Sequence, residues 1–111
     1  MSKRALALLV LVLGGSAEAQ AFEAQGHRGA RWWRPENTLS AFRYALEMGA
    51  DTLEMDLHAT KDNVLVITHD PYLSPDLCLD PEGGKITKQI LVRNLTLKEL
   101  QAYDCGSLRN P

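Results

Sequence analysis

Residues 51–70, DTLEMDLHATKDNVLVITHD, decide the fold, because they hold two short strand patterns on either side of a polar turn. Apolar and polar residues alternate strictly over 52–58, which predicts a strand with one apolar face. The other face carries Glu54, Asp56 and His58. Two ionised carboxylates side by side in a partly buried site repel each other, so this pair indicates a cation or a shared proton. A water-facing edge strand would alternate in the same way, with the three side chains simply solvated.

The second apolar run, VLVI at 64–67, predicts a fully buried strand that ends just before His69. Only residues 59–63 connect it to the preceding strand, which is too few for a crossover helix. Either an extended loop keeps the two strands parallel, or they form an antiparallel hairpin centred near 61–62. In that hairpin Glu54 would lie opposite His69. The sequence does not decide between the two arrangements.

A short first strand is predicted upstream, over residues 21–26. It ends at His27 and Arg28, which are flanked by Gly26 and Gly29. Glycine tolerates the backbone conformations of tight turns, so the flanking pair would expose both side chains at the strand end.

A helix is predicted between the first two strands. Asn37 or Thr38 can cap its start, and Gly49 ends it. Its apolar stripe comprises Leu39, Phe42, Ala45 and Leu46. Strand, helix and strand within about 35 residues are typical of a βαβ unit with parallel strands in a covered sheet.

The N-terminus predicts a secretory signal peptide at 1–19. Lys3 and Arg4 form a basic start, 5–13 is an unbroken apolar run, and a small-x-small cleavage site ends at Ala19. An apolar run of this length is too short to span a bilayer, so no stable membrane anchor is expected after cleavage. The mature chain is expected in the periplasm or outside the cell.

The composition is that of one small globular domain, with 111 residues of which 45% are hydrophobic. The formal net charge is −2 and no basic cluster is present, which argues against nucleic acid as a partner.

The C-terminal third is predicted to be a loop over 72–89 and a short helix over 97–103, opened by a capping box at 96–99. Cys78 and Cys105 lack the spacing of a zinc site. Export would permit a disulfide between them, although two cysteines are also an ordinary count. The sequence leaves their pairing open.

Four short motifs together resemble the glycerophosphodiester phosphodiesterase family, which carries an HR…EN…ExD…HD pattern. Here the motifs are His27-Arg28, Glu36-Asn37, Glu54-x-Asp56 and His69-Asp70. The surrounding segments HRG…PENTLSAF, GADTLEMDLHATKDN and VITHDPYL are similar as well. The resemblance implies an α/β fold, a (β/α)₈ TIM-type barrel with its site at the carboxyl ends of the strands. Such a barrel needs on the order of 250 residues, so residues 20–111 are expected to form its N-terminal portion, about three strands of eight.

The resemblance implies a metal-dependent hydrolase that cleaves a small-molecule glycerophosphodiester to glycerol 3-phosphate and an alcohol. Glu54 and Asp56 would hold the divalent metal, and all-oxygen ligation suits Ca²⁺ or Mg²⁺. His27 and His69 would serve as general acid and base, in an order that the sequence does not give. A third metal-binding carboxylate and a later lysine of the family cannot be assigned in this chain.

Three further residues receive supporting roles in this hypothesis. Arg28 would offer a bidentate donor fork to the phosphate. Glu36 and Asn37 would orient the loop or the Arg28 fork, with a role of Asn37 mainly as a helix cap as the alternative. Trp32 and Trp33 either cover a core edge or contact a glycerol or lipid group.

Two alternatives remain beside the hydrolase. The chain could be an inactive or binding-only fragment, which would fold poorly by itself. A phospholipase D-like lyase acting on lysolipids would share the same barrel and a similar pair of histidines.

Overall fold

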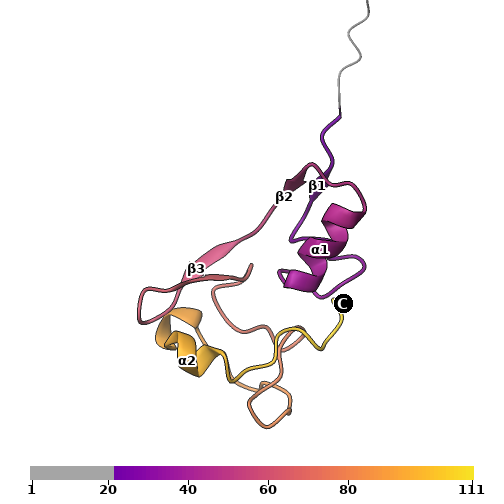
Figure 1. The fold of residues 1–111 in the computed structure, drawn as a ribbon. Coiled ribbons are helices and arrows are strands. Elements are labelled where there is room, and N and C mark those ends of the chain that lie inside the picture. Colours follow the sequence, from indigo (N-terminus) through magenta and orange to yellow (C-terminus); the bar gives the residue numbers. More distant parts are fainter. Residues whose placement is uncertain (1–21) are drawn as a thin grey trace, which may run out of the picture.

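The computed structural model describes residues 22–111, so the predicted signal peptide lies outside the described residues. Seven short elements follow one another along the chain (Figure 1), and their bounds are β1 Gln25–Gly26, α1 Leu39–Glu47, β2 Thr52–Leu53, β3 Leu57–Ala59, β4 Leu65–Ile67, the 3₁₀ helix η1 Val92–Asn94 and α2 Leu97–Leu100. β1, α1 and β2 form a first lobe, and the chain from β3 to α2 forms a second.

The first lobe is the predicted βαβ unit. β1 and β2 pair in parallel, with Gln25 opposite Thr52, and α1 packs against β1. The α1 helix is capped by Thr38, whose Oγ1 accepts the backbone N–H of Ala41 at 3.2 Å. Gly49, at φ 87°, follows its last turn as predicted.

The buried face of α1 differs from the predicted stripe. Ala41, Phe42 and Ala45 are buried, whereas Leu39 is 83% exposed and Leu46 is exposed as well. Gly26 and Gly29 bring the chain so near α1 that a Cβ atom at Gly26 would lie 3.0 Å from Ala45 and one at Gly29 would lie 2.8 Å from Ala41. The small residues of α1 line this contact, and Leu39 and Leu46 lie outside it.

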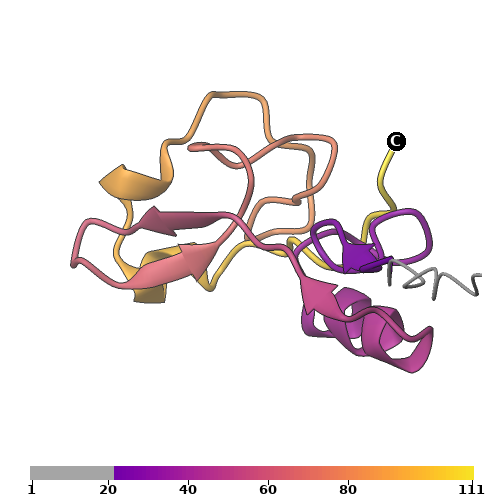
Figure 2. The same ribbon diagram turned by 90° about the horizontal axis from the view of Figure 1, so that it is seen from above.

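The predicted long strand over 52–58 is divided into β2 and β3. β3 leaves the parallel pair and forms an antiparallel hairpin with β4, Leu57 lying opposite Ile67 (Figure 2). The described residues therefore contain one parallel pair, β1 and β2, and one antiparallel pair, β3 and β4. The hairpin alternative is the one that the structure shows.

The register of this hairpin is one residue away from the expected one. The loop spans three residues, 61–63, and Asn63 adopts φ 61°, the left-handed conformation that a three-residue hairpin loop requires. Asp56 consequently pairs with Thr68, whose N–H donates to its carbonyl at 3.0 Å. Continued by two residues, this register sets Glu54 across from Asp70 rather than His69.

β4 is not the fully buried strand that its apolar sequence predicts. Leu65 is 66% exposed and Ile67 is also exposed, while Val66 packs against the core of the second lobe. A two-stranded ribbon has only one covered face here, so alternate side chains of β4 remain in solvent.

The second lobe is built around a small core of its own. Leu73, Cys78, Ile86 and Val92 are buried together, and the first three belong to the segment 72–89 that was predicted as a loop. A disulfide joins Cys78 to Cys105, which answers the question that the sequence left open. The bond fastens this loop to the segment after α2.

α2 begins with the predicted capping box, in which Thr96 and Glu99 bond reciprocally, but it ends at Leu100 rather than near Tyr103. The Oδ1 atom of Asp62, in the hairpin loop, accepts the first helical N–H, that of Leu97, at 3.0 Å. The hairpin is thereby docked on the positive end of α2.

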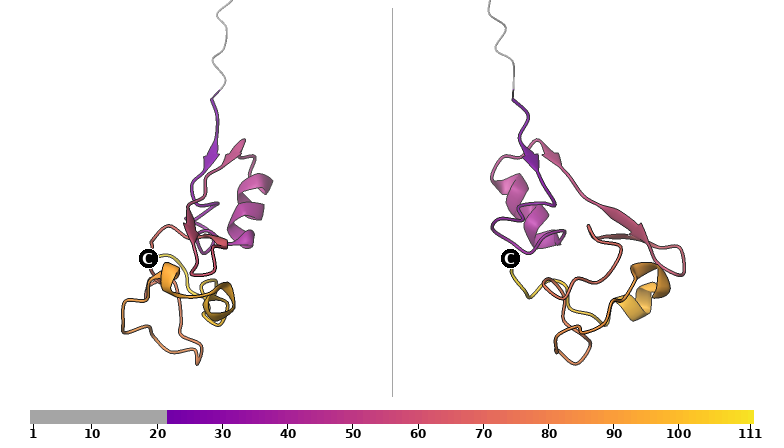
Figure 3. Two further views of the ribbon diagram at one scale, coloured as in Figure 1. Left: turned by 90° about the vertical axis from the view of Figure 1, so that its left-hand side faces the viewer. Right: turned by 180° about the vertical axis from the view of Figure 1, so that it is seen from behind.

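The last residues return from the second lobe to the first (Figure 3). There Asn110 bonds the loop 31–36. Trp32 and Trp33 of this loop are exposed, so the interpretation that they cover a core edge is wrong for the described residues. Within 22–111 no helix has the length and apolar character needed to cross a membrane.

Candidate active site

His27 and Arg28 lie where β1 ends, in a turn closed by the Gly29 N–H, which donates to the Gly26 carbonyl at 3.1 Å. Gly29 has φ 81°, and a Cβ atom there would lie 2.8 Å from the backbone of Ala41. Only glycine therefore allows the chain to turn this close to α1. The turn presents His27 to solvent and directs Arg28 inward.

Arg28 and Glu36 form the most buried ion pair of the described residues. The Arg28 Nη1 atom donates to both carboxylate oxygens of Glu36, at 3.0 and 3.1 Å. The two side chains are 14% and 5% exposed. Arg31 adds a third contact, with its Nε 3.3 Å from the same carboxylate. The Arg28 fork that the phosphate hypothesis requires is thus oriented, and partly occupied, by Glu36.

Glu54 and Asp56 approach this pair from the segment between β2 and β3. Glu54 Oε2 accepts the backbone N–H of Arg28 at 2.9 Å and lies 3.8 Å from His27 Nε2. Asp56 Oδ2 lies 3.7 Å from Arg28 Nε, and neither atom has a hydrogen-bond partner in the described structure although both are buried. Two of the four motifs are therefore in direct contact with a third.

His69 follows β4, and its contacts are separate from those of the first cluster. Its Nδ1 lies 3.0 Å from Asp70 Oδ1, which fixes the ring nitrogen that faces the carboxylate. His58 does not join the carboxylates on its strand face, because its Nε2 bonds the His69 carbonyl oxygen at 3.1 Å. In the described part of the chain no hydrogen bond or ion pair links the His69 ring to His27. The two residues are connected only along the backbone, through the hairpin of β3 and β4.

The chemistry of the donor set fits a hard cation in part. Carboxylate oxygens are suitable ligands, and the partnerless Asp56 Oδ2 is a buried oxygen that a cation would satisfy. Glu54 and Asp56 are each about one-third exposed or less. Between residues 22 and 111, however, no three His, Cys, Asp or Glu side chains are grouped closely enough to hold a metal ion. The described residues bring two carboxylates, Glu54 and Asp56, to this part of the structure.

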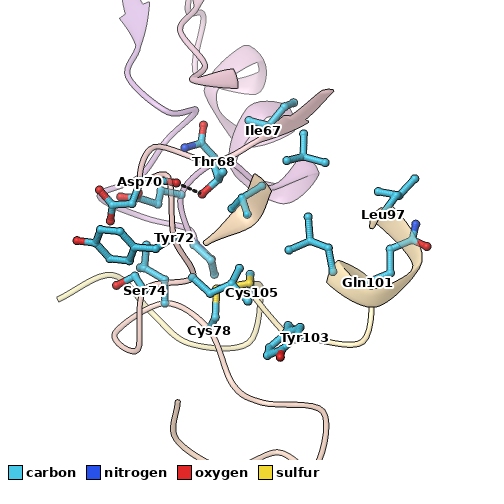
Figure 4. Close-up of a pocket in the computed structure, with 18 residues that line it drawn as sticks. Ile67, Thr68, Asp70, Tyr72, Ser74, Cys78, Leu97, Gln101, Tyr103 and Cys105 are labelled. Carbon is cyan, nitrogen blue, oxygen red and sulfur yellow. Dashed lines mark hydrogen bonds between the residues drawn. A yellow bond between two sulfur atoms is a disulfide. The ribbon is translucent and has the colours of Figure 1, made fainter. Parts of the chain in front are cut away.

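A mostly apolar cavity of about 260 Å³ lies between the lobes, with the disulfide on its wall (Figure 4). Asn37 and Asp70 reach its lining, together with Glu36. The Asn37 amide is buried without a hydrogen-bond partner in the described residues, and its backbone has φ 55°. The cap of α1 is Thr38, so Asn37 is not simply a helix cap. The lining of this cavity does not include His27, Arg28, Glu54, Asp56 or His69.

Asn110 is a site residue that the sequence did not reveal. Its Oδ1 accepts the Glu36 N–H at 3.0 Å, and its Nδ2 donates to the carbonyls of Arg34, at 2.7 Å, and Arg31. These partners precede it by 74 to 79 residues, so no local pattern could indicate the contact. It fixes the backbone of the loop that carries Glu36.

Comparison with known proteins agrees with the motifs. The sequence pattern of the Glycerophosphoryl diester phosphodiesterase family matches residues 27–111. A putative glycerophosphodiester phosphodiesterase of Bacillus subtilis (strain 168), YhdW, is 40% identical over 85 residues, which are 77% of this chain and 31% of the relative. A lysophospholipase D of Homo sapiens is 47% identical over 47 residues, which are 42% of this chain and 15% of that protein.

Two solved structures resemble the fold. A putative glycerophosphoryl diester phosphodiesterase from Silicibacter pomeroyi DSS-3 superposes with a TM-score of 0.75 at 39% identity, over 78% of this chain and 30% of that one. An Oleispira antarctica phosphodiesterase in complex with the product sn-glycerol-3-phosphate superposes with a TM-score of 0.63 at 32% identity. The match covers 77% of this chain and 31% of that one. The chain thus spans about a third of the length of these relatives.

Proposed function

Because the chain belongs to the glycerophosphoryl diester phosphodiesterase family, we propose that it supplies one side of the active site of a barrel enzyme. That enzyme hydrolyses glycerophosphodiesters to glycerol 3-phosphate and an alcohol. The observation that carries the proposal is the contact of Glu54 with both Arg28 and His27, reinforced by the buried Arg28–Glu36 pair. A surface strand would have no reason to gather these groups.

The reaction breaks the bond between phosphorus and the alcohol oxygen and forms a bond from phosphorus to an attacking oxygen. The attacking hydroxyl must lose a proton and the departing alkoxide must gain one. Histidine changes its charge near neutral pH, so His27 and His69 are suited to these transfers. Glu54 lies near His27 Nε2, and Asp70 faces His69 Nδ1, so each ring has a carboxylate that can hold it in place.

Negative charge gathers on the non-bridging phosphate oxygens in the transition state. Arg28, held by Glu36, would present its remaining N–H groups to that charge. Glu54 and Asp56 would bind Ca²⁺ or Mg²⁺, and a bound divalent cation supplies further charge stabilisation. Asp56 Oδ2, buried and without a hydrogen-bond partner among the described residues, is the atom that supports this assignment.

Two further proposals concern the whole protein. Residues 1–19 would direct it to the periplasm or the exterior and be removed after Ala19, which N-terminal sequencing of the exported protein would test. A lysophospholipase D activity on lysolipids is a second candidate function, favoured by the relative of that name.

A segment exchange tests the proposed function. The matching third of the Oleispira phosphodiesterase is replaced by residues of this chain, which yields an exchange protein of the relative's length. It should hydrolyse glycerophosphocholine, and His27→Ala or His69→Ala should each lower turnover by ~10²–10⁴-fold. Glu54→Gln and Asp56→Asn should weaken Ca²⁺ or Mg²⁺ binding in calorimetry. Full activity of the double carboxylate variant in excess chelator would refute the metal assignment.

A further inference from the structure

The loop 31–34, RWWR, presents two large aromatic side chains to solvent beside the candidate site. Trp32 is 88% exposed and Trp33 is 64% exposed. They are the two tryptophans of the chain. Trp32 also lines the same surface hollow as His27 and Asn110. Exposing two adjacent tryptophan side chains to water costs free energy, and such apolar patches often mark a surface that binds a partner.

The backbone beneath these tryptophans is firmly held. The N–H groups of Trp33 and Arg34 donate to the Ala30 carbonyl, at 2.8 and 3.0 Å, which closes a tight turn. The Nδ2 group of Asn110 donates hydrogen bonds to the carbonyl oxygens of Arg31 and Arg34 in this loop. A fixed loop loses little conformational freedom on docking, so this exposed pair is pre-organised for a binding surface.

The two tryptophans are flanked directly by the cationic residues Arg31 and Arg34. A third arginine, Arg28, is directed inward, where Glu36 and Asp56 pair with it. Glu36 is buried between Arg28 and Arg31. Arg34 lies over the Tyr44 ring at 4.7 Å, which keeps its charge close to the loop. Tryptophan together with arginine is the composition that favours the interface of an anionic bilayer.

We propose that the loop 31–34 docks the protein reversibly on an anionic phospholipid surface. Both tryptophan rings enter the headgroup region, and Arg31 and Arg34 face the lipid phosphates. Since Trp32 and His27 share one hollow, docking turns that hollow toward the lipid. The docking itself does not depend on the proposed hydrolase activity. Two aromatic side chains give reversible binding rather than a permanent anchor.

The intrinsic fluorescence of the full chain tests the proposal directly, because all of its tryptophan emission comes from this loop. The chain is titrated with vesicles of phosphatidylcholine containing phosphatidylglycerol, with pure phosphatidylcholine vesicles in parallel. The emission should move to shorter wavelength with the anionic vesicles, and brominated acyl chains should quench it. Raising NaCl from about 0.05 M to about 0.5 M should weaken the effect. An unshifted, unquenched emission at saturating anionic lipid would overturn the proposal.

Sedimentation with the same vesicles separates the loop from other apolar parts of the chain. Trp32→Ala/Trp33→Ala should lower the partition coefficient by about tenfold or more, since two aromatic side chains no longer enter the interface. Leu39→Ala, which removes an equally exposed apolar side chain of α1, should leave it within about twofold. The apolar run 5–13 is common to all these proteins. Equal losses in both variants would mean unspecific adsorption and reject the loop as the docking surface.

Discussion

At the residue scale, Glu36 holds more of the candidate site together than any other side chain described. Both of its carboxylate oxygens accept Arg28 Nη1, Arg31 lies at 3.3 Å, and its own N–H is held by Asn110. Its side chain thus links the strand-end turn to the loop 31–36, and its backbone N–H links that loop to the returning C-terminal segment. Its sequence neighbours predicted a supporting role, but only the fold shows how many segments depend on it.

Glu36→Ala would leave the buried Arg28 guanidinium without its hydrogen-bonded partner, with only Asp56 Oδ2 at 3.7 Å from its Nε. Removing one partner of a buried ion pair typically costs about 3–5 kcal/mol, so we expect a loss of that size in the exchange protein. Urea unfolding followed by circular dichroism gives the free energy of unfolding. Glu47→Ala, at the exposed end of α1, is the matched control and should change it by less than about 0.5 kcal/mol. Similar small changes in both variants would show that Glu36 is not a structural link.

Contacts between distant residues limit what the sequence could predict at this scale. The pairs Glu54-x-Asp56 and His69-Asp70 are visible because each lies within a few residues. The contact of Asn110 with Glu36 spans 74 residues and leaves no local trace. The role of Asn37 was also hard to predict, because an asparagine just before a helix suggests an N-cap. The structure shows that Thr38 is the cap, and the Asn37 amide has no hydrogen-bond partner among the described residues.

At the scale of elements, features that depend on neighbouring residues were predicted correctly from the sequence, whereas features that depend on tertiary packing were not. The capping box of α2, the glycine after α1 and the turn at 61–63 all depend on neighbouring residues, and all were predicted. The hairpin register was not, because one additional loop residue in the left-handed conformation moves every pairing by one. The exposed Leu39 was missed because the close approach of the β1 backbone to α1 is a tertiary property.

The disulfide is the element-scale bond whose contribution can be measured. Cys78 and Cys105 are separated by 27 residues, and closing a loop of that length contributes about 3–4 kcal/mol in the chain-entropy model. Cys78→Ser/Cys105→Ser in the exchange protein should lower the free energy of unfolding by this amount. Because Cys78 is also a core residue, Cys78→Ala/Cys105→Ala serves as a second variant without a buried hydroxyl. An unchanged unfolding midpoint in both variants would show that the bond does not stabilise the lobe.

The start of α2 should weaken in acid. Hydrogen bonds from the Thr60 hydroxyl and the Leu97 N–H lower the pKa of Asp62, and those from Thr96 lower the pKa of Glu99. A carboxylate with a lowered folded-state pKa stabilises the fold above its ordinary value, 3.8 for Asp62, and that stability is lost as pH falls through the folded value. The free energy of unfolding of the exchange protein should therefore decrease as the pH is lowered below about 4.

Asp62→Asn isolates this effect, because the amide oxygen can still accept both hydrogen bonds but carries no titrating charge. The decrease in the free energy of unfolding between about pH 4 and pH 2 should be smaller in this variant than in the unmodified exchange protein. Asp76→Asn is the control, since the Asp76 side chain has no partner among the described hydrogen bonds. Identical pH profiles for Asp62→Asn and the parent would contradict the assignment.

At the scale of the whole molecule, the buried hydrophobic residues of the two lobes form separate groups. One core lies between α1 and the β1 turn, and the other lies under the disulfide-bonded loop. β1 and β2 are two residues each, and the hairpin has an open edge on both sides among the described residues. A two-stranded ribbon is marginally stable by itself, so these strands need further surface to pack against.

The chain by itself is therefore expected to unfold without cooperativity and to lack hydrolase activity. Leu57 and Leu65 of the hairpin and Leu39 and Leu46 of α1 are exposed large hydrophobics, and such surface binds apolar dyes and promotes association. A cooperative domain of about 90 residues would absorb roughly 60 kcal/mol on thermal unfolding near 60 °C, whereas two weakly coupled lobes would give a broad and smaller transition. Differential scanning calorimetry of the chain, with dye binding and a glycerophosphocholine assay in Ca²⁺ or Mg²⁺, measures all three properties. The exchange protein is the matched control, because it should melt in one sharp transition and turn over substrate. A single sharp transition of the chain, together with metal-dependent turnover, would show that the described residues already form a complete functional unit.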